Sequence, residues 1–179
     1  MPSKTLSTTL AALAILTALP PSSFAASEPD ELTAAVVLSF LRYGEWQPSG
    51  ARGPLTVGVV GRESFAQVLR RTVEGKSIND RAVRVVELKT PLEAQSCQVV
   101  YFATDNSSEI RASLDAARRA LTIGETRDFV DAGGAVQLMV IDGHMGFEVS
   151  LEALERANVT ISSKLLRFGQ IRRKQGDRR

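Results

Sequence analysis

The sequence predicts a single α/β domain with a largely parallel sheet, a C-terminal antiparallel hairpin and helices on both faces of the sheet. Short β-branched runs alternate with helical segments between residues 54 and 125, and this alternation is typical of parallel strands connected by helices. Asp142-Gly143 stands between two apolar runs, which indicates a hairpin. With 179 residues, 44% of them hydrophobic, the chain is long enough for one domain with a substantial core.

The first 25 residues differ from the rest of the chain. Lys4 is their only charged residue, residues 10–19 form an apolar run, and Ser23-Phe24-Ala25 fits the small-x-small pattern of a cleavage site. This apolar run is about half of the roughly 20 residues that a membrane-spanning helix needs, which weighs against the alternative of an uncleaved anchor. We therefore expect a signal peptide over residues 1–25, cleaved near Ala25, and an exported, soluble mature protein.

The charge balance excludes one class of function. The chain has 22 Lys and Arg against 20 Asp and Glu, and removal of Lys4 leaves 22 − 1 = 21 basic residues, a net charge of +1. A nucleic-acid-binding protein would need a concentrated basic face, so we do not expect this chain to bind nucleic acid. Basic residues gather instead in the tail at residues 172–179, which is expected to be flexible and solvated.

The first element expected in the mature chain is a helix. Ser27 and Asp30 have the spacing of a helix start, and Gly44 marks the expected end. The apolar residues recur at intervals of four, four and three, which predicts one apolar stripe along the helix, made of Leu32, Val36, Phe40 and Tyr43. A loop is expected at residues 47–54, because Gly, Pro and Ser are frequent there.

The central part of the chain supplies the parallel sheet. We expect strands at residues 55–61, 81–88, 97–103 and 120–125, because each is rich in β-branched or aromatic residues. Between them, we expect helices at residues 63–73 and 107–120.

The C-terminal part departs from this alternation after Gly133-Gly134. Two apolar runs, at residues 135–141 and 146–151, surround Asp142-Gly143, and the four-residue gap between them predicts a loop longer than two residues. A helix closed by Asn158 is expected next. Residues 159–171 then read as a strand that passes into a final helix.

Residue types suited to catalysis or metal binding are scarce. His144 is the only histidine and Cys97 the only cysteine, so neither a hydrolytic triad nor a metal site is expected. Gly75-Lys76-Ser77 resembles the end of a phosphate-binding loop, but Arg70 occupies the position where that motif needs its first glycine. We expect no catalytic residue, metal or cofactor, a turn at Gly75, and a buried Cys97 that behaves as a small hydrophobe.

Two places are candidates for binding. Arg62 follows the first strand of the sheet and precedes a helix, where free N–H groups and the guanidinium could hold an anion; the alternative is a surface arginine beside an ordinary turn. Ser162, Ser163 and Lys164 begin the last helix, where serine is a good cap and lysine adds a positive charge. Arg167, one turn later, belongs to the same candidate surface. The residues alone leave the cap and the anion site open.

Three segments of the chain resemble the YfiR family. They are AAVVLSFLRYGEWQP (34–48), LTVGVVGRESF (55–65) and the C-terminal stretch 121–171. The resemblance rests on a helix that ends in a Trp near a Pro, on the TIG-to-GG segment, and on ISSKLL at residues 161–166. It extends over roughly residues 31–171, which indicates a YfiR-like domain at 26–171.

The resemblance implies a periplasmic, non-enzymatic protein. It implies repression of an inner-membrane diguanylate cyclase through binding of its periplasmic sensor region, which lowers cyclic di-GMP signalling and biofilm formation. It also implies a homodimer and an outer-membrane lipoprotein that can sequester the repressor. Some members have disulfides, but Cys97 has no second cysteine to pair with in this chain.

A second function from a different class stays open. The chain could be a periplasmic small-ligand-binding protein for transport or sensing, using Arg62 and residues Ser162–Lys164. A contiguous exposed apolar patch would favour the regulatory protein. A closed polar pocket with converging donors would favour the ligand-binding protein.

Overall fold

The computed structural model describes residues 28–46 and 53–172. The helices there are α1 (Glu28–Tyr43), α2 (Glu63–Val73), α3 (Ser107–Ala116), α4 (Leu151–Ala157), α5 (Ser163–Leu166) and the 3-10 helix η1 (Pro91–Ser96). The strands there are β1 (Gly44–Trp46), β2 (Leu55–Gly61), β3 (Ser77–Ile78), β4 (Arg81–Leu88), β5 (Val99–Ala103), β6 (Leu121–Gly124), β7 (Val136–Ile141), β8 (His144–Ser150), β9 (Val159–Ile161) and β10 (Gln170–Arg172).

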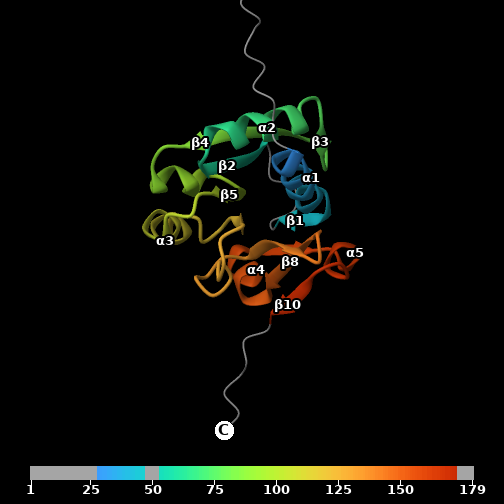
Figure 1. The fold of residues 1–179 in the computed structure, drawn as a ribbon. Coiled ribbons are helices and arrows are strands. Elements are labelled where there is room, and N and C mark those ends of the chain that lie inside the picture. The colour runs from blue at the N-terminus through green and yellow to red at the C-terminus, as the bar shows by residue number, and fades with distance from the viewer. Residues whose placement is uncertain (1–27, 47–52, 173–179) are drawn as a thin grey trace, which may run out of the picture.

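The main sheet is curled, and helices surround it (Figure 1). Its eight strands have the order β10-β8-β7-β6-β5-β2-β4-β3, and a second sheet pairs β1 with β9. All neighbouring strands of the main sheet are parallel except β7–β8 and β3–β4. The predicted class, a largely parallel sheet with a C-terminal antiparallel hairpin, is confirmed.

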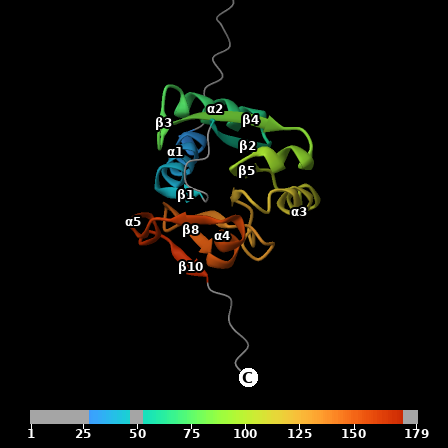
Figure 2. The same cartoon turned by 180° about the vertical axis from the view of Figure 1, so that it is seen from behind.

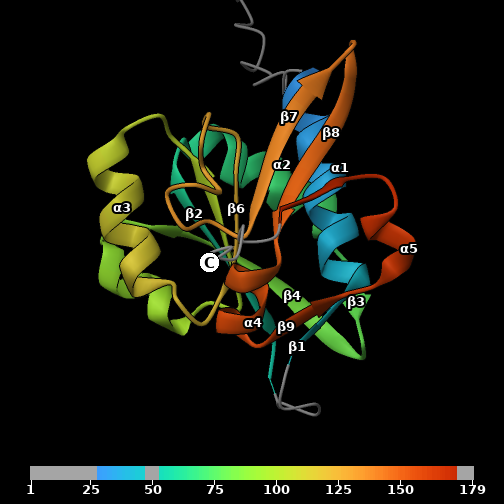
Figure 3. The same cartoon turned by 90° about the horizontal axis from the view of Figure 1, so that it is seen from below.

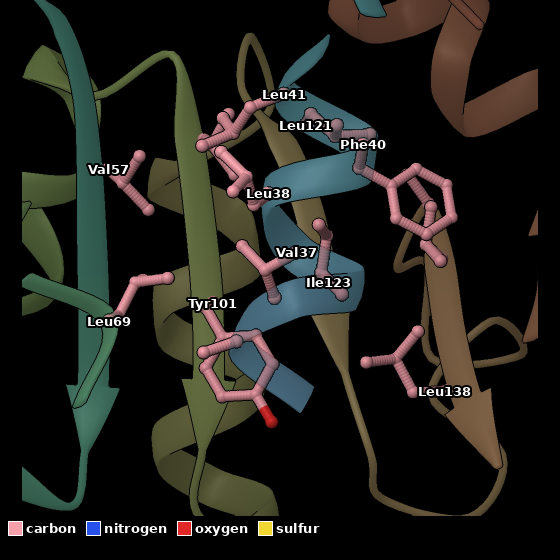
Figure 4. Close-up of a cluster of buried hydrophobic side chains, with 14 of the residues drawn as sticks. Val37, Leu38, Phe40, Leu41, Val57, Leu69, Tyr101, Leu121, Ile123 and Leu138 are labelled. Atoms are coloured by element: carbon pink, nitrogen blue, oxygen red, sulfur yellow. The ribbon is translucent and has the colours of Figure 1, made fainter. Parts of the chain in front are cut away.

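The central strands are buried on both faces, as parallel strands connected by helices must be. On β5, Val99 and Tyr101 pack with α1 and α2 in one apolar cluster, whereas Val100 and Phe102 pack with α3 and η1 in the other. Figure 4 shows the first cluster, in which side chains of α1 point onto those of the sheet. Its labelled members are Val37, Leu38, Phe40, Leu41, Val57, Leu69, Tyr101, Leu121, Ile123 and Leu138.

The strand order creates a crevice. After β2 the chain crosses to β4 on one side, and it then returns to place β5 on the other side of β2. The connections therefore leave β2 and β5 in opposite directions. In open α/β sheets, the carboxyl ends of two such strands form the usual ligand-binding position.

The predicted apolar stripe of the first helix is only partly in the core, because Phe40 is buried and Val36 packs against the core, but Leu32 and Tyr43 are exposed. The buried residues of α1 are Thr33, Ala34, Val37, Leu38, Phe40 and Leu41, whereas Leu32 and Tyr43 are 52% and 43% exposed. The helix is apolar around much of its circumference, so periodicity cannot choose a face. Ser27, the expected start, lies outside the described residues.

The predicted long loop in the C-terminal hairpin is also wrong. The strands β7 and β8 pair as far as Ile141 and His144, so the connection is Asp142-Gly143 alone. Both residues have positive φ, 50° and 78°, as the two-residue turn of a hairpin requires. His144 is therefore the first residue of β8, not a loop residue. His144 and Gly146 interrupt the apolar pattern at the beginning of β8 and conceal its start.

Several other local predictions agree with the structure, whereas α3 and β5 are shorter than predicted and residues 170–171 of the expected final helix belong to β10. The strands at 55–61 and 81–88 and the helix at 63–73 have the predicted bounds, and Asn158 ends α4 in the left-handed conformation. The turn at Gly75 is confirmed, but β3, which follows it, was not predicted. Cys97 is buried at the C-terminal end of η1, just before β5. Arg172, the first residue of the expected tail, ends β10 and pairs with Glu148.

Candidate functional site

Arg62 lies in the crevice at the carboxyl ends of β2, β5 and β6. The crevice has a volume of about 640 Å³. Each of the three strands contributes its last residues and the polar positions that follow. The lining consists of Gly61, Arg62, Phe102, Ala103, Thr104, Asp105, Glu125 and Thr126.

A glycine allows β2 to turn beside the end of β5. Gly61 has φ +97°, and a Cβ at this position would lie 2.5 Å from the carbonyl oxygen of Ala103. The backbone N–H of Arg62 donates to that same oxygen at 3.2 Å. Arg62 then acts as the N-cap residue of α2 in an extended conformation, without a side-chain cap. From this turn the Arg62 side chain reaches α1, and its guanidinium also lies 6.0 Å from the ring centre of Phe65 in α2.

The Arg62 guanidinium already has a partner. Its Nη1 donates to both carboxylate oxygens of Asp30, at 3.1 and 3.3 Å. Asp30 lies in the first turn of α1, so this ion pair connects that helix to the end of β2. Arg62 therefore acts first as a link within the protein.

Glu125 is an exposed residue of the crevice lining, and two buried hydroxyl groups hold its carboxylate. Its Oε1 accepts hydrogen bonds from Tyr101 at 2.5 Å and from Thr33 at 3.0 Å. Burial raises the pKa of the Tyr101 phenol well above its usual value, and the negative charge of Glu125 contributes to the increase. Tyr101 therefore stays protonated and remains a donor. These bonds fix the Glu125 carboxylate relative to α1 and β5.

The charges of the crevice suit hydrogen-bond donors better than anions. Asp105 and Glu125 contribute two carboxylates, whereas Arg62, the cation of the lining, is paired with Asp30. An anion placed here would be repelled by the carboxylates, and a cation or an amine would be attracted. Sequence reasoning missed both residues, although Glu125 is the last residue of the predicted strand 120–125 and Asp105 lies two residues after the predicted strand 97–103.

The second candidate, Ser162, is a helix cap. Its Oγ accepts a hydrogen bond from the N–H of Lys164 at 3.3 Å, which confirms the predicted capping role. Its own N–H donates to the carbonyl oxygen of Tyr43 at 2.9 Å, so the joint between β9 and α5 is attached to the end of α1. Leu165 is buried and anchors the four-residue α5 to the core. Ser163 is exposed.

An aromatic and basic surface surrounds this cap. We call Tyr43, Lys164, Arg167 and Phe168 the C-terminal surface. Phe168 is 67% exposed, and the guanidinium of Arg167 lies 4.7 Å from the centre of its ring. Figure 3 shows α5 beside the C-terminal end of α1, where Tyr43 lies. Apolar and positively charged groups are therefore exposed together.

The two sequence-predicted sites are separate. Arg62 contacts Asp30 near the start of α1, whereas Ser162 contacts Tyr43 at its end. Thirteen residues of helix separate these contacts, a length of about 20 Å at 1.5 Å per residue. One small ligand cannot contact both sites.

Within residues 28–46 and 53–172, no group of three or more His, Cys, Asp or Glu side chains is placed to hold a metal ion. In the same part of the chain, no helix combines the length and the apolar character needed to cross a membrane.

A family model described as YfiR/HmsC-like matches residues 30–170. The chain belongs to the YfiR/HmsC-like family. The match confirms the resemblance carried by the helix before Trp46 and by the ISSKLL segment. It supports a periplasmic regulatory role in general.

One solved structure supports the same fold for this YfiR/HmsC-like chain. It is the crystal structure of a conserved domain protein from Vibrio cholerae O1 biovar El Tor, with a TM-score of 0.54 and 15% sequence identity. The similarity covers 82% of this chain and 60% of that chain. At this identity it concerns the fold alone. Comparison with curated proteins finds no match.

Proposed function

We propose that this chain is a periplasmic, non-enzymatic regulator that binds the periplasmic sensor region of an inner-membrane diguanylate cyclase. Binding would repress cyclic di-GMP synthesis and so limit biofilm formation. The proposal includes cleavage of the signal peptide near Ala25, a homodimer, and release of the cyclase when an outer-membrane lipoprotein sequesters the regulator. Membership of the YfiR/HmsC-like family supports the general role.

The exposed Phe168 is the observation that carries the binding function. An aromatic side chain that is 67% exposed and packed by a guanidinium has the chemistry of an interface anchor. Burial of this ring against a partner would remove apolar area from water, while Arg167 would keep the ring in place. Together with Tyr43, this ring gives the C-terminal surface the apolar character expected for protein binding.

Lys164 adds an electrostatic requirement. It lies in the first turn of α5, where the helix dipole disfavours a cation. Among the described residues, no carboxylate lies within ion-pair distance of its Nζ. A positive charge with neither a favourable dipole nor an internal partner is suited to an acidic group on a partner. Ser162, whose Oγ accepts from the N–H of Lys164, fixes the backbone of this exposed lysine at the start of α5, next to Ser163.

The test measures binding of the purified sensor domain by calorimetry, together with thermal melting. Lys164→Glu and Phe168→Ala should each weaken binding at least fivefold, as expected for residues worth more than about 1 kcal/mol. Their melting temperatures should stay within a few degrees of the parent. The matched control is Arg119→Glu, which changes an exposed arginine that lies after α3 and outside the C-terminal surface. Unchanged binding by both C-terminal variants would reject this surface as the contact.

The alternative is a periplasmic small-ligand-binding protein that uses the crevice. The observation in its favour is Glu125, whose carboxylate is held by two buried donors at the strand ends. Arg62 would border such a ligand, whereas Ser162–Lys164 would lie about 20 Å away. Small primary amines such as putrescine should then raise the melting temperature of the parent but not of Glu125→Gln. If no such amine changes the melting of the parent, this alternative is rejected.

A further inference from the structure

The strand β4 has an open edge. Its outer neighbour, β3, has only two residues and pairs with Arg81 and Ala82, whereas β2 covers the inner side of β4 from Val83 to Leu88. Figure 2 shows β4 extending well past β3. Among the described residues, the outer side of β4 therefore has no strand partner from Val83 onward.

The outward backbone groups of this edge can be assigned. Ile78 and Arg81 close the two-residue hairpin between β3 and β4, so the backbone groups of Arg81 point outward, toward β3. Because the direction alternates along a strand, the N–H and C=O groups of Val83, Val85 and Glu87 also point outward. The contact of Arg70 Nε with the Val85 carbonyl oxygen, at 3.5 Å, agrees with this direction.

A positively charged groove lies beside the open edge. It has a volume of about 540 Å³ and runs between the last turn of α2 and β4, with Val83 and Val85 in its wall. Its charged lining residues are Arg70, Arg71, Glu74 and Lys76, three cations against one anion. Residues 70–89 contain six Lys or Arg and three Asp or Glu, a net charge of +3, so the rest of the chain sums to 2 − 3 = −1.

The charge at the edge decides between two occupants. Charged side chains on edge strands often prevent self-association. Antiparallel pairing of β4 with β4 of a second copy would bring the arginines of both copies together, and like charges opposite one another destabilise a sheet. An acidic strand would instead meet complementary charges. The groove therefore favours an acidic partner over a second copy of this chain.

We propose that the β4 edge binds an extended acidic segment of a partner protein, which adds to the sheet as a further strand beside Val83–Glu87. Main-chain hydrogen bonds to the outward groups would hold the segment. Every second side chain of the added strand would lie on the α2 side, near Arg70, Arg71 and Lys76. The segment should therefore carry Asp or Glu at alternate positions. The proposal rests on the proposed regulatory function only for the identity of the partner.

The probe is a blocked peptide, Thr-Glu-Val-Glu-Val-Glu-Thr, added to the ¹⁵N-labelled mature chain. The peptide should shift the amide resonances of Val83, Val85 and Glu87 and slow their hydrogen exchange. A peptide with Lys in place of each Glu should bind at least tenfold more weakly. Raising the salt from about 50 mM to about 500 mM should weaken binding of the acidic peptide, because it shortens the screening length.

Two variants test the two parts of the contact. The double variant Arg70→Glu, Arg71→Glu should lower affinity for the acidic peptide at least tenfold, whereas Arg119→Glu should not change it. Val85→Pro removes one outward N–H and no bond to β2, a substitution that edge strands tolerate, and it should abolish the exchange protection. If Val85→Pro fails to fold, the double variant and the hydrogen exchange of the parent still test whether the acidic peptide binds at the β4 edge.

Equal binding of the acidic and basic peptides, or resonance shifts away from β4, would overturn the proposal. Vesicles of phosphatidylglycerol test a membrane as the alternative occupant of the groove. If the parent and folded Val85→Pro bind these vesicles and the double arginine variant does not, the groove binds a membrane and the proposal is overturned. Phe168→Ala should leave peptide binding unchanged, so a failure of the proposed sensor contact and a failure of this proposal are distinguishable.

Discussion

Replacement of Tyr101 by phenylalanine should remove one hydrogen bond and keep the packing of the ring. The hydroxyl donates to Glu125 at 2.5 Å, and the ring stacks on Phe65 with 4.2 Å between centroids. A hydrogen bond to a charged group contributes about 1.5–3 kcal/mol. Glu125 keeps its bond to Thr33 and is partly solvated, so it is not left unsatisfied. We therefore expect a loss of about 1.5 kcal/mol at neutral pH, the lower end of that range.

The same substitution should change the dependence of stability on alkaline pH. The pKa of Tyr101 is raised in the folded protein, mainly by burial, so above the ordinary tyrosine pKa of about 10 the unfolded chain loses a proton that the folded chain keeps. The folded state then binds more protons, and its free energy of unfolding falls as pH rises. The fall is about 1.4 kcal/mol per pH unit for one group. Tyr101→Phe lacks this contribution.

Urea unfolding of the mature chain, followed by the fluorescence of Trp46, measures both effects. At pH 7 the free energy of unfolding of the parent should exceed that of Tyr101→Phe by about 1.5 kcal/mol. At pH 11 this difference should be smaller by about 1.4 kcal/mol. Tyr43→Phe, at an exposed position, is the control and should change stability at pH 7 by no more than about 0.5 kcal/mol. Equal stability of parent and Tyr101→Phe at pH 7, or parallel curves up to pH 11, would refute the reasoning.

Three further predictions concern the cap, the cysteine and the leader. Ser162→Ala should lower the free energy of unfolding by about 0.5–2 kcal/mol, because it removes the acceptor at the start of α5, whereas Ser163→Ala should have little effect in the same urea titration. Cys97→Ala should keep partner binding and change stability little. In the parent, a thiol reagent should label Cys97 of the folded chain slowly, because the thiol is buried and its pKa is raised. Fast labelling of the folded chain would contradict this. N-terminal sequencing of periplasmic protein should find cleavage near Ala25, and an intact chain embedded in the membrane would disprove the signal peptide.

Sequence reasoning succeeded where a few neighbouring residues determine the outcome. The strands at 55–61 and 81–88 are marked by β-branched runs, and Asn158 ends a helix because it tolerates the left-handed conformation. Ser162 caps α5 through an N–H only two residues away. In each case the deciding contact lies within one turn of chain, so the pattern of residues contains it.

Only the tertiary structure decided which side chains meet. Thr33 and Glu125 are 92 residues apart in sequence, and no local pattern shows that Thr33 and Tyr101 donate to the same Glu125 oxygen. The separation of Arg62 from Ser162 depends on how α1 lies across the sheet. The open edge of β4 depends on the short length of β3. The sequence by itself thus predicted most of the central strands and helices, the caps and the family, because short-range hydrogen bonding and periodicity specify them. The crevice, the C-terminal surface and the β4 edge required the fold, because long-range packing and strand order create them.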